Sequence, residues 1–325
     1  MPMPLDWKTP PEIEPRQEYY EFDLARALSA VVGVRSLVPA DAFTADILGT
    51  ERSGNGVVIR ADGLVLTIGY LITEAEAVWL TLSSGSAVPG HVVAYDQETG
   101  FGLVQALARV EVPALELGVS SQATPATSVI AAGVGGPGHS VAARVVARQE
   151  FAGYWEYLID QAIFTAPAHP FWGGTGLIGP DGRLIGIGSL QIEQAGETSE
   201  TVPLNMYVPT DLLKPILDDL LTLGQANRPP RPWLGLYATE VDDRVIIAGV
   251  AGGGPAANAE LRQGDVVLSV AGAKVSGLAG LFRKVWSMGK AGVKVPMTVY
   301  RDGRPMQLTV TSGDRNRFLK GPSLH

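Results

Sequence analysis

The chain has 325 residues, which fits two or three domains, and it contains no cysteine. The missing cysteines exclude a disulfide framework, a thiolate nucleophile and a metal site with cysteine ligands. Apolar residues make up 46% of the sequence and charged residues 18%, which favours packed cores over disorder, and the net charge of -8 argues against binding to nucleic acid.

Residues 1–22 are rich in proline and charge and end in three aromatic residues, Tyr19, Tyr20 and Phe22. Their composition predicts a loosely ordered arm, and the alternative is that the aromatic side chains dock on a neighbouring subunit. The segment lacks the basic start and apolar run of a signal peptide, and no stretch of the chain has the roughly 20 apolar residues of a membrane helix. We therefore expect a soluble, cytoplasmic protein that does not contact membranes, or a periplasmic one if a leader has been removed.

Residues 23–224 have the pattern of one β-rich domain. The segment "DLARALSAVVGV" predicts a short helix that leads into a strand, and many short β-rich runs separated by glycine turns follow it. Strands of this length and spacing predict an antiparallel barrel or sandwich. Ala61–Gly63 and Pro180–Gly182 are typical hairpin turns, because glycine accepts the positive φ that such turns impose.

The segment Thr210–Gly224 breaks this β rhythm and predicts an amphipathic helix at the end of the first domain. Thr210 can cap its start, Gly224 can close its end, and Pro215 is the one local objection. The apolar residues with helical spacing are Leu212, Leu213, Ile216, Leu217 and Leu220. Residues 225–232 have three prolines and almost no apolar content, so they predict a stiff linker and the domain boundary.

Residues 233–313 have the length of a small α+β domain. An apolar helix is predicted over residues 277–288, and a final hairpin is expected to turn at Asp302 and Gly303. Residues 314–325 are expected to form an unstructured tail.

Several sequence blocks in both domains resemble the HtrA/Deg protease family. They are "ADGLVLT", "DQETGFGLV" and "HPFWGGTGL" in the first domain and "GGPAANAELRQGD" in the second. The resemblance covers roughly residues 24–312. It implies a mainly β fold in which a trypsin-like double β-barrel is followed by an α+β PDZ domain.

The resemblance places the family's catalytic triad at positions that carry other residues here. Tyr70 stands where the family has the catalytic His of a T-N-x-H motif. Gly100 replaces the Asp of D-P-x-T-D-L-A-V, and Gly173 replaces the nucleophilic Ser of N-P-G-N-S-G-G-P-L. Acyl transfer by this route needs a hydroxyl, an imidazole that takes its proton and a carboxylate that orients the imidazole. We therefore expect a catalytically inactive homologue.

Phe171 and Trp172 replace the small Gly and Asn that shape the oxyanion loop in the family. These aromatic residues either fill the former substrate pocket or line a remaining apolar groove. A rescued catalytic pair of His169 and Thr175 is a second possibility, although Thr175 lies beyond the nucleophile position. No two histidines have the spacing of a metal site, so we expect neither a metal nor a cofactor.

The second domain keeps the parts with which a PDZ domain binds peptides. The segment "RPWLGL" matches the loop that holds a peptide's terminal carboxylate through backbone N–H groups, and a peptide would add as an extra strand beside it. Leu278 and Phe282, on the following helix, are candidate walls of the peptide site, with core packing as the alternative. By this match, the loop residues are Trp233, Leu234, Gly235 and Leu236.

The signature G-x-P-A-x-x-A-G-L-x-x-G-D also matches, with Glu260 in place of one glycine. Asp265, at its end, is expected to form a turn rather than to act as an acid.

Two classes of function compete. The first is a peptide-binding or regulatory scaffold whose PDZ domain recognises C-terminal or unfolded segments of other proteins. The alternative is an active serine-type or threonine-based endopeptidase in protein quality control with a rearranged site. A homotrimer driven by the N-terminal segment, or an assembly with active relatives, is a further expectation from the resemblance.

Overall fold

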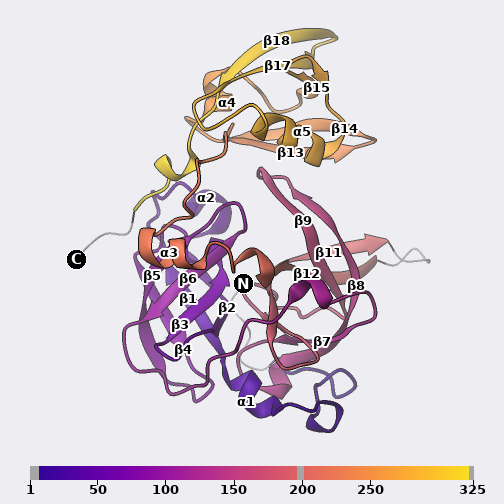
Figure 1. The fold of residues 1–325 in the computed structure, drawn as a ribbon. Helices are drawn as coiled ribbons and strands as arrows, with labels where there is room; N and C mark the ends of the chain where they lie inside the picture. Colours follow the sequence, from indigo (N-terminus) through magenta and orange to yellow (C-terminus); the bar gives the residue numbers. More distant parts are fainter. Residues whose placement is uncertain (1–6, 196–200, 322–325) are drawn as a thin grey trace. The chain divides into compact units, whose positions relative to one another are not determined.

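The computed structural model describes residues 7–195 and 201–321 and divides the chain into two compact units (Figure 1). Unit 1 comprises residues 1–149, 161–227 and 320–325, and unit 2 comprises residues 150–160 and 228–319. Strands dominate in both units, in agreement with the mainly β prediction. Within the described ranges, no helix has both the length and the apolar character needed to span a membrane.

The first barrel of unit 1 is a closed antiparallel sheet with the strand order β1-β2-β3-β6-β5-β4. Helix α1 (Leu24–Ser29) precedes it as predicted, and the Asp23 carboxylate caps this helix by accepting the Arg26 N–H at 2.9 Å. Gly63, at φ 85°, closes the predicted turn between β2 and β3. The elements are β1 (Val31–Leu37), α2 (Ala45–Leu48), β2 (Glu51–Val58), β3 (Leu64–Ile68), β4 (Ala77–Thr81), β5 (Ala87–Tyr95) and β6 (Phe101–Ala106).

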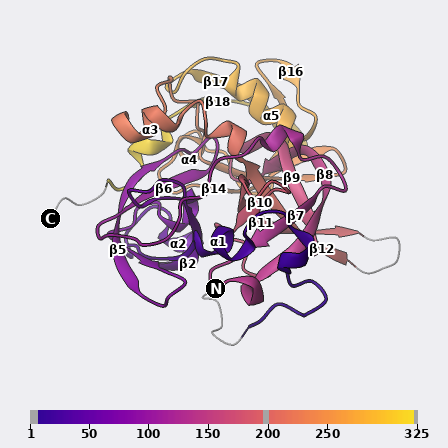
Figure 2. The ribbon, with the colours of Figure 1, turned by 60° about the horizontal axis from the view of Figure 1, so that its bottom comes forward.

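The second barrel of unit 1 is also closed, with the order β10-β11-β12-β9-β8-β7 (Figure 2). Val141, Ile163 and Tyr207 are fully buried in its core. Gly182, at φ 76°, closes the predicted turn between β10 and β11. The strands are β7 (Ser128–Ala132), β8 (Ser140–Gly153), β9 (Tyr157–Ala166), β10 (Gly176–Ile178), β11 (Leu184–Ala195) and β12 (Thr201–Pro209). The two barrels confirm the predicted double-barrel fold.

The described part of the N-terminal arm, residues 7–22, packs against the second barrel instead of remaining loosely ordered. The Thr9 N–H donates to the Gly138 carbonyl at 2.8 Å, and the Ile13 carbonyl accepts a backbone N–H of β8 at 2.7 Å. Trp7 and Ile13 also pack on the core of that barrel. The apolar side chains spaced between the prolines give the arm its own contacts, which composition alone does not reveal. Residues 1–6 lie outside the described residues.

The helix predicted over Thr210–Gly224 forms only in part. Residues Thr210–Leu212 make a 3-10 turn (η5), and helix α3 runs over Leu217–Leu223. Pro215 explains the difference, because a proline inside a helix removes an N–H donor and clashes with the preceding turn. Gly224, at φ 71°, ends the helix as predicted. Other 3-10 turns are η1 (Gln17–Tyr19), η2 (Gly69–Leu71), η3 (Ser120–Gln122) and η4 (Pro137–His139).

Unit 2 is built on an antiparallel sheet with the order β13-β14-β15-β17-β18, in which β16 pairs with β15. Strand β13 therefore lies at one edge of the sheet. The predicted turn at Asp302 and Gly303 has φ values of 49° and 80° and joins β17 to β18. The elements are β13 (Leu236–Val241), β14 (Arg244–Val250), α4 (Pro255–Asn258), β15 (Val266–Val270), β16 (Ala273–Lys274), α5 (Gly277–Trp286), β17 (Lys294–Arg301) and β18 (Arg304–Thr311).

The last described residues are more ordered than the unstructured tail that the sequence suggests. Residues Arg315–Arg317 form a 3-10 turn (η6), and the Phe318 ring lies 4.7 Å from the Trp233 ring, centroid to centroid. Farther along, the Lys320 N–H donates to the Glu74 carboxylate of the first barrel at 2.9 Å. An aromatic residue and a backbone donor thus find partners although the segment lacks a periodic pattern. Residues 322–325 lie outside the described part of the chain.

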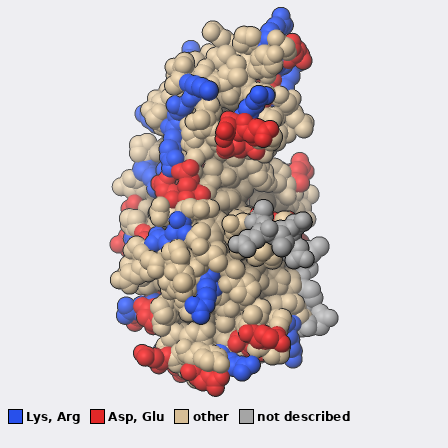
Figure 3. All heavy atoms as spheres, turned by 90° about the vertical axis from the view of Figure 1, so that its right-hand side faces the viewer, with Lys and Arg blue, Asp and Glu red and all other residues tan. Residues whose placement is uncertain are grey.

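Charged side chains of both signs are mixed on the surface. On the face of the molecule in Figure 3, Lys and Arg side chains lie among Asp and Glu side chains. This face therefore presents mixed charge rather than the clustered basic side chains that phosphate binding needs. Within unit 1, Arg60 and Asp62 also form an exposed ion pair at 2.7 Å.

Candidate functional site

Unit 1 brings the three triad positions, Tyr70, Gly100 and Gly173, to one place. Tyr70 lies in η2, directly after β3, and the N–H of the preceding Gly69 donates to the Gly100 carbonyl at 2.7 Å. A Cβ atom placed on Gly173 would lie 2.7 Å from the Tyr70 hydroxyl oxygen. The fold therefore positions these residues as the resemblance implies, but it gathers one phenol and two glycines. We call these three residues the triad region.

The Tyr70 side chain occupies the space in front of Gly173. Its hydroxyl donates to the Ser189 carbonyl at 3.0 Å. Burial raises the pKa of this phenol above its ordinary value near 10. Tyr70 is therefore a neutral hydrogen-bond donor at physiological pH and does not take a proton from a nucleophile.

Asn55, on β2, holds the loop that carries Gly173, and the sequence analysis missed it. The Asn55 backbone N–H donates to the Gly173 carbonyl at 2.8 Å, and its Nδ2 donates to the Phe171 carbonyl at 3.1 Å. Its Oδ1 accepts the Val134 N–H at 3.0 Å. The sequence carries no signal for it, because Asn55 stands among polar residues and glycines in ERSGNGVV, and only the structure shows that it is buried. Asn55 thus joins the first barrel to the second.

The neighbouring Gly174 packs directly against the first barrel. It has φ of 74°, and a Cβ atom there would lie 1.8 Å from the Asn55 carbonyl oxygen. Only glycine meets both conditions without moving the backbone.

His169 and Thr175 are both buried near this loop, but each is engaged by other groups. His169 Nδ1 accepts the Phe171 N–H at 3.0 Å, so Nε2 carries the proton and donates to the His139 carbonyl at 2.9 Å. The Thr175 hydroxyl donates to the Trp172 carbonyl at 2.8 Å. Burial lowers the pKa of His169 to about 4, so the ring is neutral at pH 7.

The N-terminal arm covers part of the same loop. The Trp7 ring centroid lies 5.1 Å from that of His169 and 5.5 Å from that of Phe171. Phe171 and Trp172 are themselves half-buried. Aromatic side chains of the arm and of the loop itself therefore pack together where the resembling family carries a catalytic serine.

Unit 2 contains the loop that matches a PDZ carboxylate site, residues 233–236, which we call the carboxylate loop. Gly235 has φ of 74°, and the N–H groups of Leu234, Gly235 and Leu236 converge on one point. Such a concave group of backbone N–H donors binds anions. Trp233 differs from the other three, because its backbone N–H and carbonyl pair with Gly313 at 3.0 and 2.8 Å.

The carboxylate of Glu156 occupies the point where the three N–H groups converge. Its oxygens accept the N–H of Leu234 at 3.0 Å, of Gly235 at 2.7 Å and of Leu236 at 3.1 Å. Burial raises the pKa of this carboxyl to about 7, against the opposing effect of the three N–H donors and of Arg315. The sequence analysis did not identify Glu156, since a lone glutamate within a β-hairpin carries no motif.

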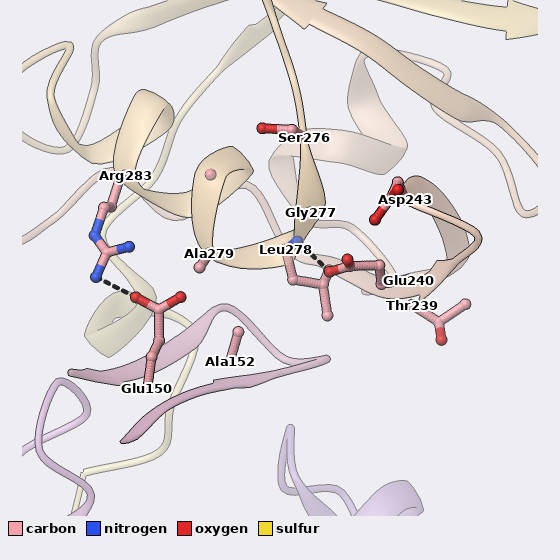
Figure 4. Close-up of a pocket in the computed structure, with 11 residues that line it drawn as sticks. Glu150, Ala152, Thr239, Glu240, Asp243, Ser276, Gly277, Leu278, Ala279 and Arg283 are labelled. Carbon is pink, nitrogen blue, oxygen red and sulfur yellow. Dashed lines mark hydrogen bonds and ion pairs between the residues drawn. The ribbon is translucent and has the colours of Figure 1, made fainter. Parts of the chain in front are cut away.

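The candidate wall residues on α5 differ in their environments. Leu278 lines a cavity of about 800 Å³ between the end of β13, the start of α5 and the last residues of β8 (Figure 4). Its N–H donates to the Glu240 carboxylate at 2.9 Å. Phe282 is instead buried in the core of unit 2 and stacks on Trp286, with 5.6 Å between the ring centroids. Core packing thus accounts for Phe282.

Glu260 stands at the glycine position of the PDZ signature and keeps the glycine-like backbone. Its φ is 60°, in the left-handed region that favours glycine. Asp265, at the end of the signature, accepts the Arg262 N–H at 2.9 Å, which is the turn role expected of it. It also accepts two hydrogen bonds from the Arg301 guanidinium, each at 2.6 Å.

Two domain families match the sequence. The model of a trypsin-like peptidase domain matches residues 54–187, and the model of a PDZ domain matches residues 232–311. These ranges cover the triad region in unit 1 and the carboxylate loop in unit 2.

Among curated proteins, the chain is similar to several that are named as serine proteases. A "Probable periplasmic serine endoprotease DegP-like" of Pseudomonas fluorescens is 26% identical over 278 residues, which is 81% of this chain and 56% of the relative. A "Serine protease Do-like HtrA" of Lactobacillus helveticus is 26% identical over 303 residues, which is 81% of this chain and 69% of the relative. The chain thus spans little more than half the length of the first relative.

Solved structures share the fold at low sequence identity. "HtrA-type protease AlgW with tripeptide" aligns with a TM-score of 0.53 at 22% identity, covering 92% of this chain and 97% of that one. "HtrA-type protease AlgW with decapeptide" aligns with a TM-score of 0.53 at 21% identity, covering 93% and 100%. These alignments show that the chain shares its fold with these solved structures.

Proposed function

The chain is HtrA-like, with a trypsin-like peptidase domain followed by a PDZ domain, and from this premise we propose that it binds peptide segments of other proteins without hydrolysing them. The observation that carries the proposal is the triad region. Tyr70, Gly100 and Gly173 supply neither a general base, nor an orienting carboxylate, nor a nucleophilic hydroxyl. Removing the triad of a serine protease costs on the order of 10^6 in turnover.

The loop around Gly173 supports the same conclusion. Phe171 takes a place in the loop that forms the oxyanion hole in the resembling family. Its N–H is donated to His169 Nδ1 at 3.0 Å, so this donor is not directed at a substrate carbonyl. Transition-state stabilisation at this position therefore needs a rearrangement of the loop as well as a new nucleophile.

The alternative is an active endopeptidase in protein quality control that uses His169 and Thr175. The names of the relatives, which include "serine protease" and "serine endoprotease", favour it. The contacts of the two side chains oppose it. His169 Nδ1 already accepts a backbone N–H, and the Thr175 hydroxyl donates to a backbone carbonyl. A base needs a lone pair directed at the nucleophile's proton.

Incubation of the purified protein with denatured casein tests the two functions. We expect no cleavage above the background of a buffer control, and no labelling by a covalent serine- or threonine-directed probe. Trypsin in the same assay serves as the positive control. Sustained cleavage that Thr175→Ala or His169→Ala abolishes would establish the alternative.

We propose that the peptides are C-terminal or unfolded segments of other proteins and that they bind at the PDZ domain. The solved neighbours whose titles name a tripeptide and a decapeptide support this class of ligand. The open cavity beside Leu278 leaves room along β13 for residues upstream of a C-terminus. A homotrimer, or an assembly with active relatives, remains part of the proposal. Tyr19 is 71% exposed and available to a partner, and light scattering measures the mass.

We propose a periplasmic location for this chain, on the basis of the names of its relatives. Several of them are named periplasmic, which favours the periplasm over the cytoplasm expected from the sequence. Cell fractionation of the natural host, with antibody detection of the chain, tests this assignment.

A further inference from the structure

The contact between Glu156 and the carboxylate loop has the pattern of a bound peptide end. A peptide that ends in this kind of loop presents two carboxylate oxygens to a group of backbone N–H donors. Here the Glu156 side chain supplies those oxygens, at 2.7 to 3.2 Å from the three nitrogens. Glu156 thus engages the N–H groups of Leu234, Gly235 and Leu236, and the Gly313 carbonyl accepts that of Trp233, so every donor of the loop is engaged within the chain itself.

The backbone next to Glu156 extends the same pattern along the edge strand. The Tyr154 carbonyl accepts the Ala238 N–H at 2.9 Å, on the open edge of β13. Tyr154 precedes Glu156 by two residues, and Ala238 follows Leu236 by two residues. A peptide that adds as a strand pairs with an edge at this two-residue spacing. The β8–β9 turn, Tyr154–Glu156, therefore imitates both the carboxylate and the first strand pairing of a ligand.

Several further contacts hold the β8–β9 turn in place. The Trp155 ring stacks on the Tyr157 ring at 5.4 Å between centroids. The Arg283 guanidinium of α5 pairs with both Glu150 and Asp160, one on each strand of the hairpin (Figure 4 shows the Glu150 pair). These pairs are exposed and contribute little individually.

Glu156 also has a strained backbone. Its φ is 60°, a region that non-glycine residues enter at a cost of about 1 kcal/mol or more, and such strain gathers at ligand clamps and switches. The carboxylate is buried as well, so it loses water and regains only the three N–H bonds and the field of Arg315. The three N–H bonds offset this desolvation cost while the turn sits in the loop, and release of the turn returns the carboxylate to water.

We propose that the β8–β9 turn is an internal ligand of the carboxylate loop, and that a peptide C-terminus binds only after it displaces Glu156. This inference rests on the proposed peptide-binding function and adds the regulation of that site. The alternative is a permanent structural contact, in which the loop has no external ligand. The two differ in what happens when the Glu156 carboxylate is removed.

Hydrogen exchange of backbone amides, measured by NMR on the full chain, tests the occupancy without any peptide. We expect the Gly235 and Leu236 amides to exchange slowly in the wild type and at least about tenfold faster in Glu156→Ala, because the acceptor is gone. Glu150→Gln is the matched control. It removes a hairpin carboxylate outside the loop, and Arg283 keeps Asp160 as a partner, so we expect less than a twofold change. Rapid exchange of these amides in the wild type would overturn the proposal.

Peptide binding tests the competition. The probe is a pool of fluorescein-labelled decapeptides with randomised positions and a free C-terminal carboxylate, compared with the same pool amidated at the C-terminus. We expect Glu156→Ala to bind the free-carboxylate pool at least about tenfold tighter than the wild type, and neither protein to bind the amidated pool. Glu156→Gln keeps the side-chain length and one acceptor oxygen but removes the charge, and we expect it to bind the free-carboxylate pool with an affinity between those of the wild type and Glu156→Ala.

The remaining outcomes separate the inference from the function on which it rests. Equal binding of the free-carboxylate pool by wild type and Glu156→Ala would refute the internal ligand and leave peptide binding intact. Faster Gly235 exchange in Glu156→Ala with no binding of either pool would refute both the competition and the proposed function.

Discussion

The triad region and the carboxylate loop differ in the groups that would carry their chemistry. In the resembling family the chemistry of this region resides in side chains, and this chain has Tyr70, Gly100 and Gly173 at the three positions. In the carboxylate loop the chemistry resides in backbone N–H groups, which Leu234, Gly235 and Leu236 retain. A site built from side chains is silenced by substitution, whereas a site built from the backbone must be covered by an occupant.

The two regions therefore differ in reversibility. Around the triad region, Tyr70, Asn55 and Phe171 are held by contacts that also hold the barrels together. We therefore expect this region to stay packed as long as unit 1 is folded. The carboxylate loop is filled by one side chain on a hairpin tip, which a competing anion can replace. Measurements of stability test the packing of the triad region, and a measurement of peptide binding tests the displacement of Glu156 from the carboxylate loop.

Substitution of Gly174 is expected to have the largest effect. The variant Gly174→Ala places a Cβ atom 1.8 Å from the Asn55 carbonyl oxygen at a φ of 74°, so we expect unfolding to become easier by about 3 kcal/mol or more. Chemical denaturation measures the change. Gly138→Ala is the control, since no atom lies within 4 Å of its Cβ position. Equal stability of the two variants would mean that the barrels do not meet closely at this loop.

Acidification is expected to weaken unit 1 through His169. Burial lowers the pKa of its ring to about 4 from 6.5, so protonation favours the unfolded chain. The contribution is fully present above pH 6.5 and is lost as the pH falls toward 4, by up to roughly 3 kcal/mol. Denaturation at several pH values, for wild type and His169→Gln, measures it. Parallel pH profiles of the two proteins would contradict this assignment.

Removal of the Asn55 side chain is expected to loosen the triad region. The variant Asn55→Ala leaves the Val134 N–H and the Phe171 carbonyl without this partner in a buried setting, at a cost of about 2 kcal/mol. Asn258→Ala, which removes one exposed bond at 3.4 Å, should change stability by less than about 0.5 kcal/mol. A similar loss in both variants would show that Asn55 has no special role between the barrels.

At the carboxylate loop we expect a pH effect opposite to that of His169: raising the pH weakens the contact of Glu156 with the loop. This is the smallest of the four predicted effects. Within the loop the pKa of Glu156 is raised to about 7, while in a released turn it returns toward 4.5. Glu156 therefore binds its proton more tightly when it occupies the loop. The equilibrium constant for this occupation falls by about tenfold between pH 6 and pH 8. The charged and titratable groups around it are Arg315, Tyr237 and Tyr154. Peptide affinity measured across this range should rise with pH in the wild type and stay flat in Glu156→Gln.

Much of the fold was predictable because its signals are local. Gly63, Gly182 and Gly303 mark hairpin turns that the structure confirms, and each has a positive φ. The helix before the linker was predicted too long. The spacing of apolar residues does not show whether Pro215 interrupts the helix, and the structure shows that α3 begins only at Leu217. The ordered arm and the 3-10 turn after β18 depend on contacts with distant residues, which sequence spacing does not report.

The candidate sites were predictable to different depths. Motif matching placed Tyr70, Gly100 and Gly173, and the fold brings these positions together. Asn55 and Glu156 were missed because each acts through partners far away in sequence, 116 residues away for Asn55 and Phe171 and 78 for Glu156 and Leu234. Motifs of residues close in sequence do not encode such long-range pairs.

The hairpin that carries Glu156 has a consequence for the order of synthesis. A ribosome makes this hairpin before it makes the strands of unit 2, so the anion-holding loop closes in the presence of a tethered carboxylate. Tethering raises the local concentration of a partner to the millimolar scale when the linker permits contact. The carboxylate loop of a newly synthesised molecule would thus already hold Glu156. The C-terminus of another protein would bind there only by displacing this side chain.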